Sequence, residues 1–251
     1  MFFWHRARIR FSPEKDWDVN AGLDAVVTKL AGIDRGAVSM ADVIVLAGYQ
    51  AIAHDGGPYD EMAFCGNRVD ATDAMFSENL APREYYATTA AKVKDDMVVR
   101  GLTMEQGVAL YGMTTDVFAF GTIFGILKDG TVGADNGSTT ITAASDGTTY
   151  KLTAEQAVLQ SDAELKAIVD KFAADEEAFE TAFAQAWVYM MNAGRYTGPT
   201  TNYCDGKGDS GESGDPTDEP TQAPASGAAA ATTGILVVSV PAMMAGAALL
   251  M

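Results

Sequence analysis

The chain has 251 residues, 48% of them hydrophobic, which is enough for one sizeable domain core and a further segment. A formal net charge of −17 excludes a nucleic-acid-binding protein, because phosphate binding needs a basic surface. The chain has two histidines, His5 and His54, so every histidine-dependent mechanism is limited to these positions.

Helix-start signals recur between residues 12 and 164. Ser12-Pro13 places a capping residue before a proline, which favours the first position of a helix. Four further spacings resemble capping boxes: Ser39 with Asp42, Thr103 with Gln106, Thr153 with Gln156, and Ser161 with Glu164. These signals predict a mainly α-helical domain.

Apolar residues at helical spacing support this prediction. One stripe is Leu23, Val26, Val27, Leu30 and Ile33, and a second is Phe179, Phe183, Trp187 and Met190 or Met191. We expect both stripes to pack in the core rather than to contact a cofactor.

Residues 128–152 differ from this helical pattern. The turn dipeptides Asp129-Gly130, Asn136-Gly137 and Asp146-Gly147 bracket the short β-branched segments "STTITAA" and "TTYKL". They predict a small β-hairpin on the helical domain.

The composition changes after residue 199. Residues 200–233 are rich in Gly, Ser, Pro, Asp and Ala, which predicts a disordered stalk. Residues 234–251, "GILVVSVPAMMAGAALLM", are apolar to the end. The expected organisation is a helical domain over residues 8–199, the stalk, and an apolar C-terminal segment.

The apolar segment predicts association with a membrane. A polar stretch, the small residues Ser226 to Ala228 and a terminal apolar run are typical of a GPI-attachment signal. A tail anchor and an apolar end without a membrane role are the alternatives, since 18 residues including Pro241 are near the lower limit for a span. GPI attachment requires export, yet "MFFWHRARIRFSPEKDW" contains no signal peptide. Either the N-terminus is incomplete, which we expect, or the protein is not exported.

Cys65 and Cys204 are too far apart in the sequence to form a local metal-binding pair. In a secreted protein they would form one disulfide. Two separate thiols are the alternative.

Six segments occur in the order found in one protein family: "RIRFSPEKDWDVN", "GLDAVVTKLAGI", "VSMADVIVLAGYQAIAHDGGP", "RVDATD", "GLTMEQGVALYG" and "FAQAWVYMMNAGRY". Over roughly residues 8–196 the chain resembles the plant-type haem peroxidase superfamily, and most closely the C-terminal domain of catalase-peroxidases. The segment "LQSDAELKAIVDKFAADEEAF" also resembles ascorbate peroxidases. The resemblance implies a mainly α-helical fold with haem between distal and proximal halves, and reduction of hydrogen peroxide in the oxidative-stress response.

The resemblance also predicts that the catalytic groups are missing. The distal helix would precede "RIRFSPEKDW", where the chain has seven residues, and His5 is expected to be a terminal histidine rather than the distal base. Aligning "VALYGMTT" with the family pattern "VALSGAHT" puts Thr114 in the place of the proximal histidine. Met113 is a poor candidate for an axial ligand, and Glu155 falls near the position of the proximal aspartate. Haem is therefore implied by the family but is not expected to bind.

Three other residues are expected to be structural. His54 precedes "DGGP", which predicts a surface histidine at a turn. Arg68 and Asp70 are expected to fix a loop through a charged pair. The helical segment around residue 108 is expected to persist because it packs, through Val108, Leu110 and Val117 or Phe118.

Three functions remain open at this point. The chain could be a haem peroxidase acting on hydrogen peroxide, a non-catalytic structural or binding module at a membrane, or a fragment of a longer catalase-peroxidase-like enzyme. In the last two cases we expect self-association or a missing distal half to cover the exposed apolar surface.

Overall fold

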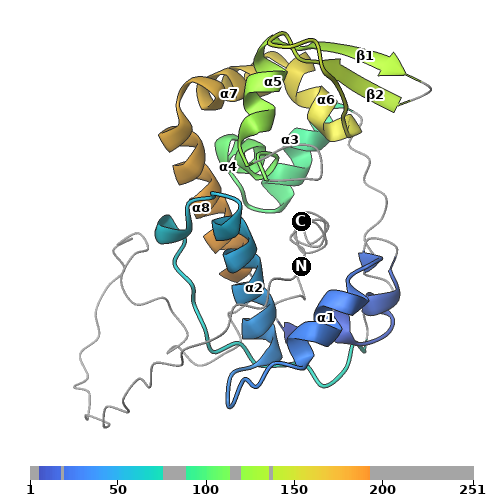
Figure 1. Cartoon of the computed structure of the whole chain (residues 1–251), viewed down its shortest axis with the longest axis vertical. Helices are drawn as coiled ribbons and strands as arrows, with labels where there is room; N and C mark the ends of the chain where they lie inside the picture. Colours follow the sequence, from blue (N-terminus) through green and yellow to red (C-terminus); the bar gives the residue numbers. More distant parts are fainter. Residues whose placement is uncertain (1–5, 18–19, 76–88, 114–119, 136–137, 193–251) are drawn as a thin grey trace.

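The computed structural model describes residues 6–17, 20–75, 89–113, 120–135 and 138–192 (Figure 1). Most of these residues are helical, which confirms the predicted fold class. The α-helices are α1 (Asp24–Ala31), α2 (Met40–His54), α3 (Ala90–Val99), α4 (Met104–Leu110), α5 (Thr122–Asp129), α6 (Ala154–Ser161), α7 (Ala163–Ala174) and α8 (Glu176–Asn192). Short 3₁₀-helices cover Arg8–Arg10, Glu14–Asp16 and Tyr59–Glu61.

Three of the predicted capping boxes begin helices. The Ser39 side chain accepts a hydrogen bond from the backbone of Asp42 at the start of α2. Thr103 and Thr153 form complete boxes, because the Gln side chain three residues later also accepts a hydrogen bond from the backbone of the capping threonine.

The other two predicted helix starts are wrong in detail. Ser161 is the last residue of α6, where its hydroxyl donates to the carbonyl of Val158. Asp162 caps α7 instead, because its carboxylate lies beside two free backbone N–H groups of the first turn and accepts from both. After Ser12-Pro13 only the three-residue 3₁₀-helix Glu14–Asp16 forms.

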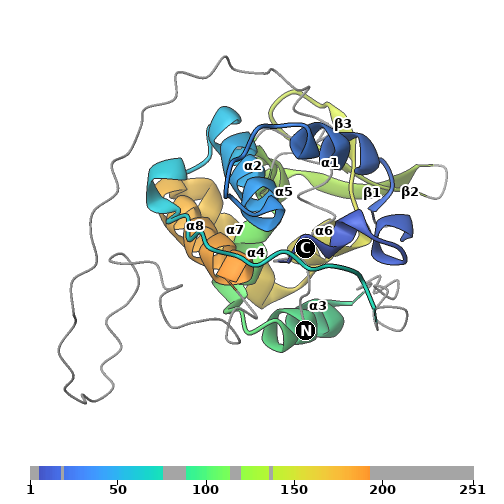
Figure 2. The same ribbon diagram turned by 90° about the horizontal axis from the view of Figure 1, so that it is seen from below.

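The main core lies between α8 and the helices α4, α5 and α7. The α8 stripe is buried as predicted, with Met190 rather than Met191 as its last fully buried member. Figures 1 and 2 both show α4 and α7 beside α8, and these helices are in contact. Aromatic rings fill the space between the helices: Phe120, Phe124, Phe172, Phe179 and Phe183.

A second, smaller core lies where α1 packs on α2. Leu30 from α1 is buried against Met40 and Ala41 from α2 and Ala7 from the N-terminal segment. Ile33 is not part of it, contrary to the prediction, because α1 ends at Ala31 and the Ile33 side chain is 47% exposed.

The predicted hairpin is present and has a third strand. Strands β2 (Ser138–Thr142) and β3 (Thr149–Lys151) pair antiparallel, and β1 (Thr131–Asp135) pairs with the other edge of β2. The sequence pattern missed β1 because "TVGAD" contains Gly and Asp, which are uncommon in strands. Ile141 anchors the sheet to the main core, whereas all five residues of β1 are exposed.

The stalk and the apolar C-terminal segment lie outside the described residues, so the predicted domain boundaries and the membrane anchor stay predictions. Within the described ranges, none of the helices is both long and apolar enough to cross a membrane.

Candidate functional site

The segment that the resemblance identifies as proximal is α4 and the residues after it. Gly107, Val108, Ala109 and Leu110 are buried, which confirms the expected packing role of Val108 and Leu110. Met113 is 3% exposed and belongs to the same core as α8. Thr114, Val117 and Phe118 lie outside the described residues, so their predicted roles stay predictions.

Two aromatic rings pack directly on the backbone before Met113. A Cβ atom at Gly112 would lie 2.5 Å from Phe124 and 2.5 Å from Phe179, so only glycine fits without displacing a ring. The Gly112 carbonyl also accepts a hydrogen bond from the backbone of Gly121, at 2.8 Å. This side of the proximal segment is therefore filled by protein.

The packing bears on whether haem fits. A haem pocket needs an axial donor and a flat cavity beside it. In the described part, Met113 is enclosed by the core, and the histidine that is placed, His54, lies elsewhere. The described residues do not fit a haem site.

His54 is the last residue of α2, and its side chain is 64% exposed. Its Nδ1 lies 3.1 Å from a carboxylate oxygen of Asp55. The predicted surface position is thus confirmed. His5 lies outside the described residues, and within the described part no cluster of three or more His, Cys, Asp or Glu side chains could hold a metal ion.

Glu155 lies in the first turn of α6 and is half-buried. The charge of its carboxylate influences the pKa of Tyr111, the residue that follows α4. Burial raises the pKa of Tyr111 to about 12, and the negative charge of Glu155 adds to this effect, whereas the Arg100 guanidinium opposes it. The described charge partner of Glu155 is thus a tyrosine, and its predicted place near the proximal aspartate position stays a prediction.

Tyr111 did not emerge from the sequence as a functional candidate. The available signal was the replacement of the small serine of the family pattern by a large aromatic residue next to Gly112. Because Tyr111 packs against the main core, it contributes to filling this region.

Tyr111 should make stability fall at alkaline pH. Its folded pKa of about 12 lies above the ordinary value of 10.0, so stability from the neutral phenol is present below pH 10 and is lost as the pH rises towards 12. We expect Tyr111→Phe to reduce this loss when urea unfolding is measured across that range. An unchanged pH dependence in Tyr111→Phe would contradict the assignment, and Tyr59→Phe, at an exposed position, is the control.

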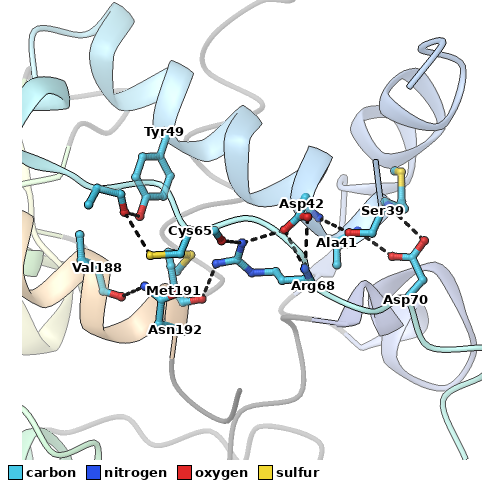
Figure 3. A network of polar contacts seen from close by, with 12 residues as sticks. Ser39, Ala41, Asp42, Tyr49, Cys65, Arg68, Asp70, Val188, Met191 and Asn192 are labelled. Atoms are coloured by element: carbon cyan, nitrogen blue, oxygen red, sulfur yellow. Dashed lines mark hydrogen bonds and ion pairs between the residues drawn. The ribbon is translucent and has the colours of Figure 1, made fainter. Parts of the chain in front are cut away.

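Arg68 is the centre of a buried polar network (Figure 3). Its side chain is 1% exposed, and Nη1 donates to Asp42 Oδ1 at 2.9 Å and to the carbonyl of Cys65. Its Nη2 donates to the carbonyl of Met191 at 2.8 Å, in the last turn of α8. One guanidinium thus joins α2, the segment around residue 65 and the end of α8.

Asp70, two residues after Arg68, holds the chain against the start of α2. Its carboxylate accepts hydrogen bonds from the backbone N–H groups of Met40 (2.9 Å) and Ala41 (2.8 Å) at the start of α2. Arg35 lies 3.5 Å from it. Arg68 and Asp70 both fix this part of the chain, as expected, but the predicted charged pair is wrong, because Arg68 pairs with Asp42 and Asp70 with Arg35.

Cys65 is disulfide-bonded and buried. Cys204, the other cysteine of the chain, lies outside the described residues. The pairing of the two therefore stays a prediction.

Comparisons with known proteins agree with the fold. The peroxidase family model matches residues 5–124. The catalase-peroxidases of Ruegeria pomeroyi and Sphingopyxis alaskensis and catalase-peroxidase 2 of Burkholderia ambifaria are 31%, 29% and 31% identical to this chain, each over 76% of it.

The matched regions cover 33%, 32% and 33% of those proteins, so the chain spans about a third of the length of these relatives. The helical fold, the family match and these relatives lead to one conclusion about ancestry: the chain belongs to the haem peroxidase superfamily and is catalase-peroxidase-like.

Proposed function

We propose that this chain is a non-catalytic peroxidase-like domain that has kept the proximal helix for packing and has lost haem binding. The observation that carries the proposal is the closed packing around Gly112 and Met113, where the rings of Phe124 and Phe179 lie against the backbone.

The chemistry of the aligned residues supports the proposal. Thr114 stands where the family has its axial histidine, and a neutral hydroxyl is a weak iron ligand beside imidazole or thiolate. In the family, a carboxylate makes the axial imidazole a stronger donor by accepting its N–H. By alignment Glu155 falls near the place of that carboxylate, but its described charge partner is Tyr111, whose pKa is raised by burial to about 12.

A second candidate function is structural support for an active peroxidase domain of a longer protein. It is favoured by the coverage of the relatives, which are about three times as long as the region they share with this chain. The two candidates agree that residues 8–199 are not themselves the catalytic unit. Reduction of hydrogen peroxide would then depend on groups outside this domain.

Titration of the purified full chain with hemin tests the proposal. We expect no stoichiometric Soret band and no peroxidase turnover in the natural chain. A band in Thr114→His alone would support a lost axial ligand beside a retained cavity, and no band in either protein would support a filled core.

A one-to-one band with turnover in the natural chain would contradict the proposal. His54→Ala and His5→Ala are the matched controls for that outcome. A band that disappears in either variant would identify hemin held by a histidine outside the proximal segment, without the proposed site being involved.

A further inference from the structure

Strand β1 is an open edge of the sheet. The strand order β1-β2-β3 leaves its outer side without a partner strand within the described sheet, and all five of its residues are exposed. Figure 1 shows the β1–β2 pair extending away from the helices. Edge strands are usually protected by lysine, by proline or by being short. The opposite edge, β3, has three residues and an exposed lysine, Lys151, whereas β1 is longer and has neither Lys nor Pro.

The hydrogen bonds of the sheet determine which backbone groups of β1 face outwards. The Thr139 carbonyl accepts a hydrogen bond from the N–H of Leu152, at 2.9 Å, so it points towards β3. In an antiparallel sheet, the N–H and C=O of one residue point to the same side, and the side alternates along the strand. The pair of Thr139 with Ala134 is therefore one without hydrogen bonds. The backbone groups of Ala134, and those of Val132 two residues earlier, point to the open edge.

These outward groups match the same edge of a second copy. In an antiparallel pairing centred on Gly133, Val132 of each copy lies opposite Ala134 of the other. Each such pair exchanges two hydrogen bonds, so every outward N–H and C=O of these residues finds a partner. A register shifted by two residues towards the N-terminus would instead need Gly130, whose carbonyl already accepts from Gln160 Nε2 at 2.6 Å.

The side chains and charges of β1 also suit this pairing. Gly133 would face Gly133 of the second copy at the two-fold axis, so no side chain stands between the strands there. Asp135 would lie opposite Thr131 of the second copy, whose hydroxyl is a hydrogen-bond donor. The two Asp135 carboxylates would be about 14 Å apart, which is beyond the screening length of about 8 Å at physiological salt. Like charges are therefore not brought together.

We propose that β1 pairs antiparallel with β1 of a second copy, which joins the two three-stranded sheets into one. This self-association does not depend on the proposed function. The contact is weak, because a strand of five residues buries far less than the roughly 800 Å² per partner of a standard interface. The net charge of −17 on each copy also opposes association, so the pairing should strengthen as salt is added.

Cysteine cross-linking of the full chain tests the register. Gly133→Cys places two thiols at the two-fold axis, where Cα atoms about 4.5 Å apart allow a disulfide. The atom nearest to a Cβ at Gly133 is Thr140 Oγ1, at 3.5 Å, so the substitution fits the fold. Thr131→Cys lies on the same edge, but its thiols would be about 14 Å from each other, too far for a disulfide. Gly125→Cys, at an exposed position of α5, measures random collision.

Under mild oxidation, the covalent dimer of Gly133→Cys should form about tenfold faster than that of either control, because pairing raises the effective concentration of its thiols. Equal rates for the three variants would overturn the proposal.

Analytical ultracentrifugation measures the association without an added thiol. The full chain is studied in a mild detergent that disperses the apolar residues 234–251. Ala134→Pro removes one outward donor from each copy and should weaken dimerisation about tenfold or more. Ala134→Val retains this donor and should dimerise like the natural chain, and circular dichroism checks that both variants are folded. A natural chain that stays monomeric at millimolar concentration, or a dimer equally stable in Ala134→Pro, would overturn the proposal.

Discussion

Replacement of Arg68 by alanine should lower the free energy of unfolding by about 3–5 kcal/mol, the usual cost of removing one partner of a buried ion pair. The substitution leaves the Asp42 carboxylate, whose side chain is 7% exposed, without its cation. It also leaves the carbonyls of Cys65 and Met191 without their donor. Urea unfolding monitored by circular dichroism would measure the loss as a lower midpoint.

Two comparisons separate this effect from a general sensitivity to lost charge. Lys171→Ala removes the exposed ion pair with Glu105 and should cost at most about 1 kcal/mol. The double variant Arg68→Met with Asp42→Leu should be more stable than Arg68→Ala, because no unpaired charge stays buried. If Arg68→Ala loses no more stability than Lys171→Ala, the network does not hold α2 and α8 together.

The helix starts were the most predictable part of the fold, because a cap and its partner lie within four residues of each other. Ser39, Thr103 and Thr153 follow this rule. Ser161 shows its limit, since the neighbouring Asp162 offers a carboxylate that accepts from two backbone N–H groups. A local pattern predicts that a helix begins but does not decide between adjacent caps.

The buried network could not be predicted in the same way. Asp42 and Arg68 are 26 residues apart, and Arg68 and Met191 are 123 residues apart. No periodicity connects such positions, so only the folded chain shows that Arg68 reaches the end of α8. The sequence indicated that Arg68 is structural, but it pointed to Asp70 as the charged partner, whereas the partner is Asp42.

The candidate site was predictable only through the family resemblance. Thr114 and Glu155 were identified by alignment, whereas the closed packing depends on Phe124 and Phe179, which come from other helices and meet at Gly112. Aromatic residues at helical spacing are equally compatible with a pocket lining and with a filled core. The structure decides for a filled core on this side of the segment.

Phe179→Ala is expected to cost about 3–5 kcal/mol of unfolding free energy, because it deletes a large side chain from the centre of the main core. Phe179 is 2% exposed, and its ring centroid lies 5.0 Å from the rings of both Phe120 and Phe124. Val99→Ala, at a position that is 76% exposed, should change stability by less than about 0.5 kcal/mol and is the control. Urea unfolding of both variants gives the comparison.

The variant also tests whether the space beside Gly112 is held closed by this ring. An apolar cavity in a rigid core stays dry and binds a small aromatic molecule such as benzene. Benzene should therefore raise the unfolding midpoint of Phe179→Ala and leave that of the natural chain unchanged. If Phe179→Ala instead loses less than about 1 kcal/mol and benzene has no effect, the neighbouring rings collapse into the space. The closure around α4 would then be a property of the whole aromatic cluster rather than of Phe179.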